Sequence, residues 1–287
     1  EKFALNFYKI LRLLDEPIGA PTYIPMYFLS ELASKNVKSV LSGDGADEIF
    51  GGYENFNYLK IFRYINMLKL NKIFSKAKNL VNLLPISKSN LSLDFKLRRF
   101  SQGMEVDEEF QNTFFLSSLS LEDHEELFNE KFDFEEIMND VIQFDKETKN
   151  VNYTDKNYLY FLNFYIPDLI CARADKAGML NSLEIRSPFL NSKLLNLMLS
   201  IPENKSYLLK NKTLLKKLAL KKFNYNFFNI KKGGFTYPMQ KWLDTSDADL
   251  NKFMNKDKFL QMKTDHLNNN KEFRNFFHCN KVLNNFV

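Results

Sequence analysis

The sequence predicts an α/β fold that is mostly helical in this chain. Apolar residues recur at helical spacing along most of the 287 residues. The best strand candidate is the short β-branched run at residues 37–41. A turn rich in glycine and carboxylates, residues 42–52, follows this strand directly. Because helix dominates, the single strand is expected to join a sheet whose other strands lie elsewhere.

The helices are predicted from apolar periodicity and from the breaks between them. The expected helical stretches are residues 2–14, 23–34, 56–99, 105–149, 157–183, 194–199, 205–222, 239–243 and 251–287. Breaks fall at the Pro/Gly segment 15–21 and at residues 84–87, where proline ends the helical pattern. Pro167 stands inside the stretch 157–183 and must kink or restart that helix, because proline lacks a backbone N–H.

Composition excludes several classes of function. The net charge of +5 comes from 40 basic and 35 acidic residues spread along the whole chain, whereas nucleic-acid binders concentrate their positive charge. No run approaches the ~18 apolar residues of a membrane span. The two cysteines, Cys171 and Cys279, and the three histidines show no metal-ligand spacing, so a reduced, cytoplasmic compartment is expected. The basic stretch 205–222 is interpreted as a solvated helix face.

The turn at residues 42–52, SGDGADEIFGG, carries the strongest functional signal. Gly43 and Gly45 let the backbone turn tightly, so that amide groups can approach a phosphate or a ribose. The start of the following helix adds unpaired amides and a dipole that favour an anion.

Three carboxylates lie in the same turn, and they would repel a bare anion. Asp44, Asp47 and Glu48 make chemical sense if Mg²⁺ links them to phosphate oxygens. The alternative is a purely structural acidic helix start, since Asp and Glu stabilise a first helical turn without any ligand. Four glycines and three carboxylates in eleven residues favour a functional loop.

Residues 40–53, VLSGDGADEIFGGY, resemble the second signature of the synthetase domain of asparagine synthetases, which also occurs in β-lactam synthetases. The resemblance implies a parallel-sheet domain of the PP-loop ATP pyrophosphatase type, similar to adenine nucleotide α hydrolases. By the same resemblance Asp44 is catalytic, because it positions the reacting groups or moves the ammonia proton, and Asp47 lies near Mg²⁺ and pyrophosphate. The resemblance further implies that four residues bind ATP: Ser42, Gly43, Gly45 and Asp47.

Three further stretches resemble the same family. Residues 165–190 match its YLPD…LE-x-R-x-PFL run and suggest substrate-binding roles for Arg173 and Asp175. Lys232 stands in a K-x-GF-like segment and takes the position of the lysine that stabilises the transition state. Glu16, in the DEPIG segment, is assigned a weak role in binding the acceptor carboxylate.

Each of these stretches has a structural alternative. Arg173, Asp175, Glu184 and Arg186 could form buried ion pairs between helices, because unpaired buried charge is costly. For Glu184 and Arg186 the structural interpretation is preferred. The segments around Glu16 and Lys232 could be ordinary turns.

The resemblance implies a reaction and a division of the chain. Residues 1–250 correspond to the C-terminal portion of the synthetase domain, and residues 251–287 form a polar helical extension. The expected reaction is ATP- and Mg²⁺-dependent conversion of aspartate to asparagine through an acyl-adenylate, with release of AMP and pyrophosphate. The SGGxDS loop and the glutaminase domain that supplies ammonia from glutamine are expected upstream of Glu1. The fragment is therefore predicted to be inactive alone.

Several alternatives stay open from the sequence. An amidotransferase or a β-lactam synthetase-like enzyme would share these motifs and use another acceptor. A non-catalytic relic would keep the fold, and a helical nucleic-acid binder is the most distant alternative. The expected partners are small-molecule substrates, without nucleic acid or membrane, and a homodimer is an open alternative for the assembly.

Overall fold

The computed structural model describes residues 2–52, 55–70, 81, 84–85, 93–201, 211–223, 253–268, 270–271 and 273–284. The described chain divides into two compact units, each assembled from two separate stretches of sequence. The first unit takes residues 1–56 and 150–237, and the second takes residues 57–149 and 238–287. The predicted division at residue 250 lies outside the described residues.

The first unit holds both described strands. Its elements are, in chain order, α1 (Lys2–Leu11), α2 (Tyr23–Ser34), β1 (Ser39–Leu41), α3 (Ala46–Ile49), α12 (Tyr153–Tyr160), η2 (Phe161–Cys171), α13 (Ala172–Met179), β2 (Glu184–Arg186), η3 (Pro188–Leu190), α14 (Ser192–Leu199) and α15 (Thr213–Lys222). The predicted helices at residues 2–14, 23–34 and 194–199 are confirmed. The α/β class is confirmed, with helix dominant, whereas the described sheet is too small to identify a PP-loop fold.

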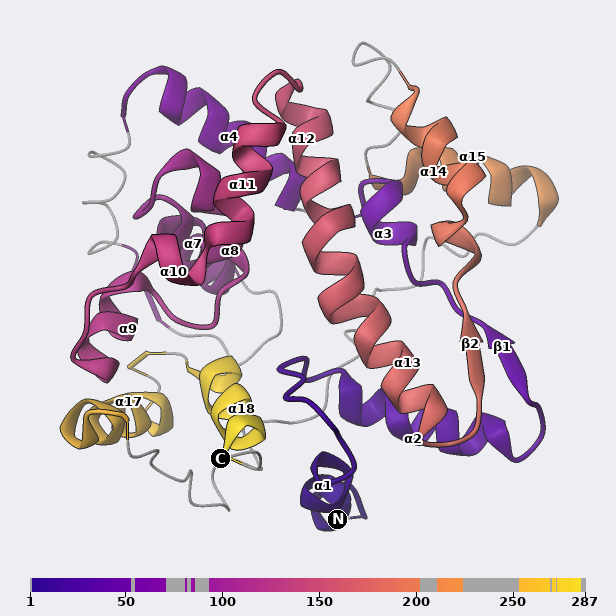
Figure 1. Ribbon diagram of the computed structural model, residues 1–287, viewed down its shortest axis with the longest axis horizontal. Helices are drawn as coiled ribbons and strands as arrows, with labels where there is room; N and C mark the ends of the chain where they lie inside the picture. The colour runs from indigo at the N-terminus through magenta and orange to yellow at the C-terminus, as the bar shows by residue number, and fades with distance from the viewer. Residues whose placement is uncertain are drawn as a thin grey trace. The chain divides into compact units, whose positions relative to one another are not determined.

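The two strands form a parallel pair within this chain. Val40 of β1 lies opposite Ile185 of β2, and Glu184 N donates to Lys38 O at 2.9 Å. Helix α13 packs against α2 and β2 (Figure 1). The expectation that every partner strand lies elsewhere is therefore wrong, because β2 supplies one partner. The expectation failed because β2 is only three residues long and directly follows a long helical pattern.

A continuous helix from Tyr153 to Met179 carries the sequence through Pro167 (Figure 1). Its central part, η2, is wound as a π-helix over Phe161–Cys171. Proline removes one helical hydrogen bond, and its ring collides with the carbonyl four residues earlier in an α-helix. Wider winding relieves that collision, so the helix does not restart at Pro167. Segments of π-helix are rare and often lie at functional sites.

The end of α13 depends on a close backbone approach at Gly178. Leu183 N donates to Gly178 O at 3.0 Å as the chain turns back toward β2. A Cβ atom built on Gly178 would lie 2.6 Å from the carbonyl oxygen of Leu183. The turn from α13 into β2 therefore leaves no room for a side chain at this position.

We expect Gly178→Ala to lower the free energy of unfolding by about 1–3 kcal/mol, because inserting a methyl group into a packed backbone contact strains the structure. Urea denaturation followed by circular dichroism measures the change. Met179→Ala, at a 52% exposed position of the same helix, is the matched control and should change stability by no more than about 0.5 kcal/mol. A stabilised Gly178→Ala variant, as helix propensity alone predicts, would contradict the close approach.

The described secondary-structure elements of the second unit are all helices. Its elements are α4 (Asn55–Met67), α7 (Leu93–Gly103), η1 (Glu108–Phe110), α8 (Gln111–Leu116), α9 (Leu121–Phe128), α10 (Phe134–Ile137), α11 (Asn139–Glu147), α17 (Lys256–Leu267) and α18 (Arg274–Leu283). These elements confirm helix within residues 105–149, and the described part of the tail contains the two helices α17 and α18. No described helix is long and apolar enough to cross a membrane.

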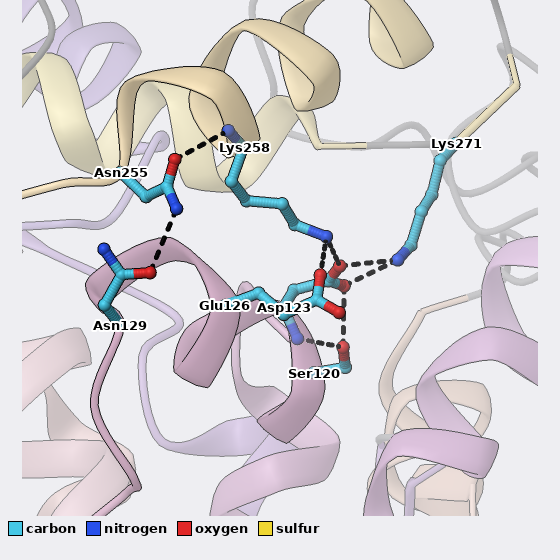
Figure 2. Close-up of polar contacts among 7 residues, drawn as sticks. All are labelled: Ser120, Asp123, Glu126, Asn129, Asn255, Lys258 and Lys271. Carbon is cyan, nitrogen blue, oxygen red and sulfur yellow. Dashed lines mark hydrogen bonds and ion pairs between the residues drawn. The ribbon is translucent and has the colours of Figure 1, made fainter.

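Aromatic and aliphatic side chains from α9, α17, α18 and the residues just before α9 and α18 build one core of the second unit. Its buried members are Leu119, Leu127, Phe259, Met262, Phe273, Phe276 and Phe277. A separate contact joins α4 to α7, where the rings of Phe62 and Phe100 stack with their centroids 4.6 Å apart. In both places, residues distant in sequence pack together. Polar side chains around Asp123 connect α9 with α17 and with Lys271 (Figure 2).

Candidate nucleotide loop

The predicted loop begins where β1 ends. Ser42 N donates to Arg186 O at 2.8 Å, which continues the ladder between β1 and β2 by one bond. The Ser42 hydroxyl donates to Asp44 Oδ2 at 2.9 Å and lies 3.1 Å from Ser187 Oγ. The strand pair therefore fixes both the backbone and the side chain at the start of the loop.

The two glycines of the loop meet different requirements. Gly45 precedes α3 with φ = 89°, in the left-handed region that side-chain-bearing residues rarely adopt. A Cβ atom there would also lie 2.4 Å from Leu190 Cδ2. At Gly43, by contrast, a Cβ atom would meet nothing within 4 Å among the described residues. The open side of the loop is thus at Gly43, where a ligand could approach the backbone.

Arg173 reaches the loop from α13 and pairs with Asp44. Its Nη2 lies 3.1 Å from Asp44 Oδ1, and its Nη1 donates to Thr22 Oγ1 at 2.7 Å. The side chains of Arg173 and Asp44 are 14% and 13% exposed. Arg173 Nε is buried without a hydrogen-bond partner among the described residues. The guanidinium thus ties three segments together and still has a donor that could serve a bound anion.

Asp47 pairs with a different cation, Lys212, which the sequence did not single out. Lys212 Nζ lies 2.9 Å from Asp47 Oδ1, and both side chains are a little over one quarter exposed. The backbone reinforces the contact, because Lys212 N donates to Phe50 O and Asn211 N donates to Gly51 O, each at 2.9 Å.

Residues 211 and 212 both have positive φ, at 54° and 57°. Such conformations are uncommon without glycine and persist only where surrounding contacts hold them. The basic stretch 205–222 was interpreted as a solvated face, and its local pattern contains no signal that distinguishes Lys212 from its neighbours. The distinguishing feature is the backbone contact with residues 50–51.

Two predicted substrate-binding residues lie apart from the loop contacts just described. Asp175 occupies an exposed position two residues after Arg173, and side chains at that helical spacing do not face one another. Glu16 is 57% exposed and lies 3.6 Å from Lys176 Nζ, which also pairs with Asp15 at 2.6 Å. The hydrogen bond with Asp15 raises the pKa of Lys176. Substrate binding by Glu16, Arg173 and Asp175 stays a prediction.

The ion pair between Glu184 and Arg186 differs from the buried structural pair that was expected. Arg186 Nε lies 3.0 Å from Glu184 Oε1, but the two side chains are 64% and 55% exposed. The expectation of burial is wrong for the described chain, because both residues belong to β2 and project from it on the same side. An exposed pair of this kind contributes little to stability.

Cys171 stands near the loop at the end of η2 and is unsuited to act as a nucleophile. Burial raises the pKa of its thiol, and the negative charges of Asp44 and Glu48 raise it further. The thiol therefore stays protonated at neutral pH, whereas nucleophilic cysteines require a lowered pKa. The side chains of the loop that are suited to take part in a reaction are therefore carboxylates, hydroxyls and cations.

The described carboxylates do not form a metal cage by themselves. No group of three or more His, Cys, Asp or Glu side chains among the described residues could hold a metal ion. Mg²⁺ commonly needs only one or two carboxylates when substrate phosphates and waters complete its octahedron. Asp47, partly exposed beside Lys212, fits that limited role. Lys232 lies outside the described residues.

Comparison with known proteins gives one coherent result. The asparagine synthase family model matches residues 1–282. Asparagine synthetase [glutamine-hydrolyzing] 1 of Bacillus subtilis (strain 168) is 27% identical over 281 residues, which cover 93% of this chain and 43% of that protein. The chain therefore spans less than half the length of this curated relative.

Shorter and more similar matches include proteins of two further organisms. A Methanocaldococcus jannaschii protein, provisionally described as asparagine synthetase [glutamine-hydrolyzing] 2, is 47% identical over 60 residues, or 21% of this chain and 11% of that protein. A Mycobacterium tuberculosis (strain H37Rv) protein with a similar provisional description is 47% identical over 53 residues, or 18% of this chain and 8% of that protein. No solved structure matches the chain significantly. From the match along nearly its whole length, the chain belongs to the asparagine synthase family.

Proposed function

We propose that this chain is part of a longer enzyme that converts the side-chain carboxylate of aspartate to an amide at the expense of ATP. One observation carries the proposal: two ion pairs, Arg173–Asp44 and Lys212–Asp47, converge on the same glycine-rich turn directly after a parallel strand. Loops at the carboxyl ends of parallel strands are common binding sites in α/β proteins. The names of the relatives support the same reaction.

Each residue of the turn has a proposed task. Ser42 and the backbone around Gly43 and Gly45 contact ATP, since no described residue closes the side of the loop at Gly43. Asp47 holds Mg²⁺, which when bound would neutralise charge on the phosphates. Lys212 adds a positive charge beside Asp47 and favours phosphate there.

Asp44 is proposed to orient the reacting groups or to accept the proton of ammonia. Arg173 and Ser42 each engage one of its carboxylate oxygens, which fixes the direction of the group. A carboxylate oxygen can accept more than one hydrogen bond, so this arrangement leaves room for a further donor. Lys232 is proposed to stabilise the negative charge that develops on the departing pyrophosphate.

The complete reaction is proposed to proceed through an acyl-adenylate. The aspartate carboxylate attacks the α-phosphorus, pyrophosphate leaves, and ammonia then displaces AMP to give the amide. Ammonia comes from glutamine hydrolysed by another domain of the longer protein. The proposed contribution of this chain is positioning of the reactants and stabilisation of charge.

We expect Asp47→Ala, made in the full-length protein, to lower kcat/KM for ATP by about 100-fold or more, because loss of one charge-stabilising group commonly has that effect. Formation of AMP and asparagine is measured with ammonium supplied directly, so that glutamine hydrolysis is not required. Lys217→Gln, on the exposed face of α15, removes one charge close in sequence to Lys212 and should leave the rate unchanged.

Three outcomes would count against this function. Full activity in Asp47→Ala would remove Asp47 from the nucleotide site. A wild-type enzyme that releases AMP with a different carboxylate, and none with aspartate, would identify an amidotransferase or a β-lactam synthetase-like enzyme instead. Absence of AMP release with every acceptor would indicate a non-catalytic relic.

A further inference from the structure

Thr22 immediately precedes α2, but its side chain does not cap that helix. A threonine before a helix usually accepts a hydrogen bond from the backbone N–H of the second or third helical residue. Thr22 makes no such bond, and its backbone has helical angles, φ −72° and ψ −9°, in place of the extended ones typical of a cap. The third helical residue is Pro25, which has no N–H to donate. The hydroxyl of Thr22 is therefore available to another part of the chain.

The hydroxyl of Thr22 contacts Arg173. Arg173 Nη1 donates to Thr22 Oγ1 at 2.7 Å, although the two residues are 151 positions apart in sequence. Helix α13, which carries Arg173, packs against α2 (Figure 1). The side chain of Arg173 is only 14% exposed, so little water competes for this bond. Hydrogen bonds in which the donor is charged are stronger than those between neutral groups, and this one joins α2 firmly to the arginine.

The other terminal nitrogen of the same guanidinium holds Asp44. Arg173 Nη2 lies 3.1 Å from Asp44 Oδ1. A guanidinium is planar, so two bonds made by its two terminal nitrogens fix both its position and its plane. With the bond to Asp44 alone, the group could turn about that one contact. Thr22 thus sets the direction from which Arg173 meets the carboxylate.

The second oxygen of Asp44 is held from the strand pair. The Ser42 hydroxyl donates its single proton to Asp44 Oδ2 at 2.9 Å, so the 3.1 Å bond between the hydroxyls of Ser42 and Ser187 takes its proton from Ser187. Ser42 follows β1, and Ser187 follows β2. The carboxylate is therefore oriented by the two serines on one oxygen and by Thr22, through Arg173, on the other.

We propose that Thr22 is a positioning residue for the ATP-dependent reaction, and that it acts through Arg173 to orient the carboxylate of Asp44. This inference rests on the proposed function, in which Asp44 orients the reacting groups or accepts the proton of ammonia. Thr22 needs no contact with substrate for this role. A misplacement of about 1 Å, caused by a change far from the reacting atoms, can lower a rate by about 100-fold.

The test compares Thr22→Val with Thr22→Ser in the full-length protein, with ammonium supplied directly. Valine has a similar size and lacks the hydroxyl, whereas serine restores it. Thr22→Val should lower kcat for amide formation by about 10-fold, because the guanidinium loses one of the two contacts that orient it. Its KM for ATP should stay within about 2-fold of the wild-type value, because the proposed ATP contacts are made by other residues. Thr22→Ser should recover most of the wild-type kcat.

A double-mutant cycle tests whether Thr22 acts through Arg173. Arg173→Lys keeps the positive charge but lacks the fork that reaches two acceptors at once. Adding Thr22→Val to this variant should lower kcat by less than about 2-fold, because two changes that remove the same contact are not additive. Ser34→Ala is the matched control, since it removes a hydroxyl that bonds within α2 to Glu31 O at 3.1 Å, and it should keep the wild-type kcat. Circular dichroism shows that the variants are folded.

Three results would overturn the role of Thr22 and leave the proposed function intact. They are an unchanged kcat in Thr22→Val, an equally lowered kcat in Thr22→Val and Thr22→Ser, and the same fold loss with Arg173 and with Arg173→Lys. The rates are measured with the acceptor that the wild type uses, so failure with aspartate affects the proposed function alone. A wild type that releases no AMP with any acceptor would overturn the proposed function and this inference together.

Discussion

Asp123→Ala should lower the free energy of unfolding by about 3–5 kcal/mol, the cost typical of removing one partner from a buried ion pair. Asp123 is 3% exposed and contacts Lys271 and Lys258 together with Ser120. Its removal would take the carboxylate away from Lys271 and would leave Lys258 with Glu126 as its ion-pair partner. The change is measured by urea denaturation at pH 7, followed by circular dichroism.

Electrostatics at Asp123 supports the same expectation. Burial alone raises the pKa of this carboxyl, but the charge and hydrogen bond of Lys271, with further help from Ser120 and Lys258, reverse the effect and lower the pKa overall. The ionised carboxylate is thus stabilised by folding at neutral pH. Because the folded pKa is lowered, this stabilisation is present above about pH 4 and is lost as the pH falls through the folded pKa.

Glu126→Ala provides the matched control for Asp123→Ala. Glu126 also pairs with Lys258, but its side chain is 52% exposed (Figure 2). An exposed ion pair contributes about 0–1 kcal/mol, so this variant should unfold almost like the wild type. If both variants lost the same stability, burial of Asp123 would not be the cause of its effect.

Because of His278, the free energy of unfolding should fall by about 3 kcal/mol as the pH is lowered from 6.5 to 4. Burial lowers the pKa of this imidazole from 6.5 to about 4, because α18 places it at 3% exposure. The unfolded chain therefore binds a proton between these values and the folded chain does not. The two pKa values differ by about 2.5, and each pKa unit corresponds to about 1.4 kcal/mol.

The sign of the effect follows from proton binding. Above about pH 6.5 both states carry neutral imidazole, and His278 contributes no pH dependence. As the pH falls from 6.5 to about 4 the unfolded state takes up the proton first, so stability declines in this window. Burial lowers the pKa of His124 as well, which adds to the decline in the same direction.

Urea denaturation at pH 7, 6, 5 and 4 measures this dependence for the wild type and for His278→Gln. The variant lacks the titrating group, so its stability should fall less between pH 6.5 and pH 4 than that of the wild type. Equal slopes for the two proteins would show that His278 is not the source. The contribution of Asp123 lies at lower pH, which keeps the two effects separable.

The local parts of this structure could be predicted because their signals lie in adjacent residues. The strand at β1, the turn at Gly45 and most helices follow from periodicity and from glycine chemistry. The parallel partner β2 could not be found in this way, because its pairing with β1 joins residues far apart in sequence. Three alternating residues after a long helix give too little pattern for a strand.

The same difference between local signals and long-range contacts applies to the candidate site. Arg173 and Asp44, both chosen from motifs, do meet in the structure. Lys212 was missed, because its place beside Asp47 depends on backbone bonds with Phe50 and on two residues with positive φ. A lysine in a basic stretch carries no local mark of such a contact. Only its tertiary contacts distinguish Lys212 from the other lysines of this stretch.

The wide winding of η2 has a consequence for the rotation of the helix that follows it. Arg173 lies two residues after the end of η2. The direction of its side chain around the helix axis therefore depends on how tightly residues Phe161–Cys171 are wound. Rewinding that segment to the 3.6 residues per turn of an α-helix would swing the guanidinium away from Asp44. Pro167 opposes α-helical winding of this segment. It thereby helps to orient the side chain of Arg173 toward Asp44.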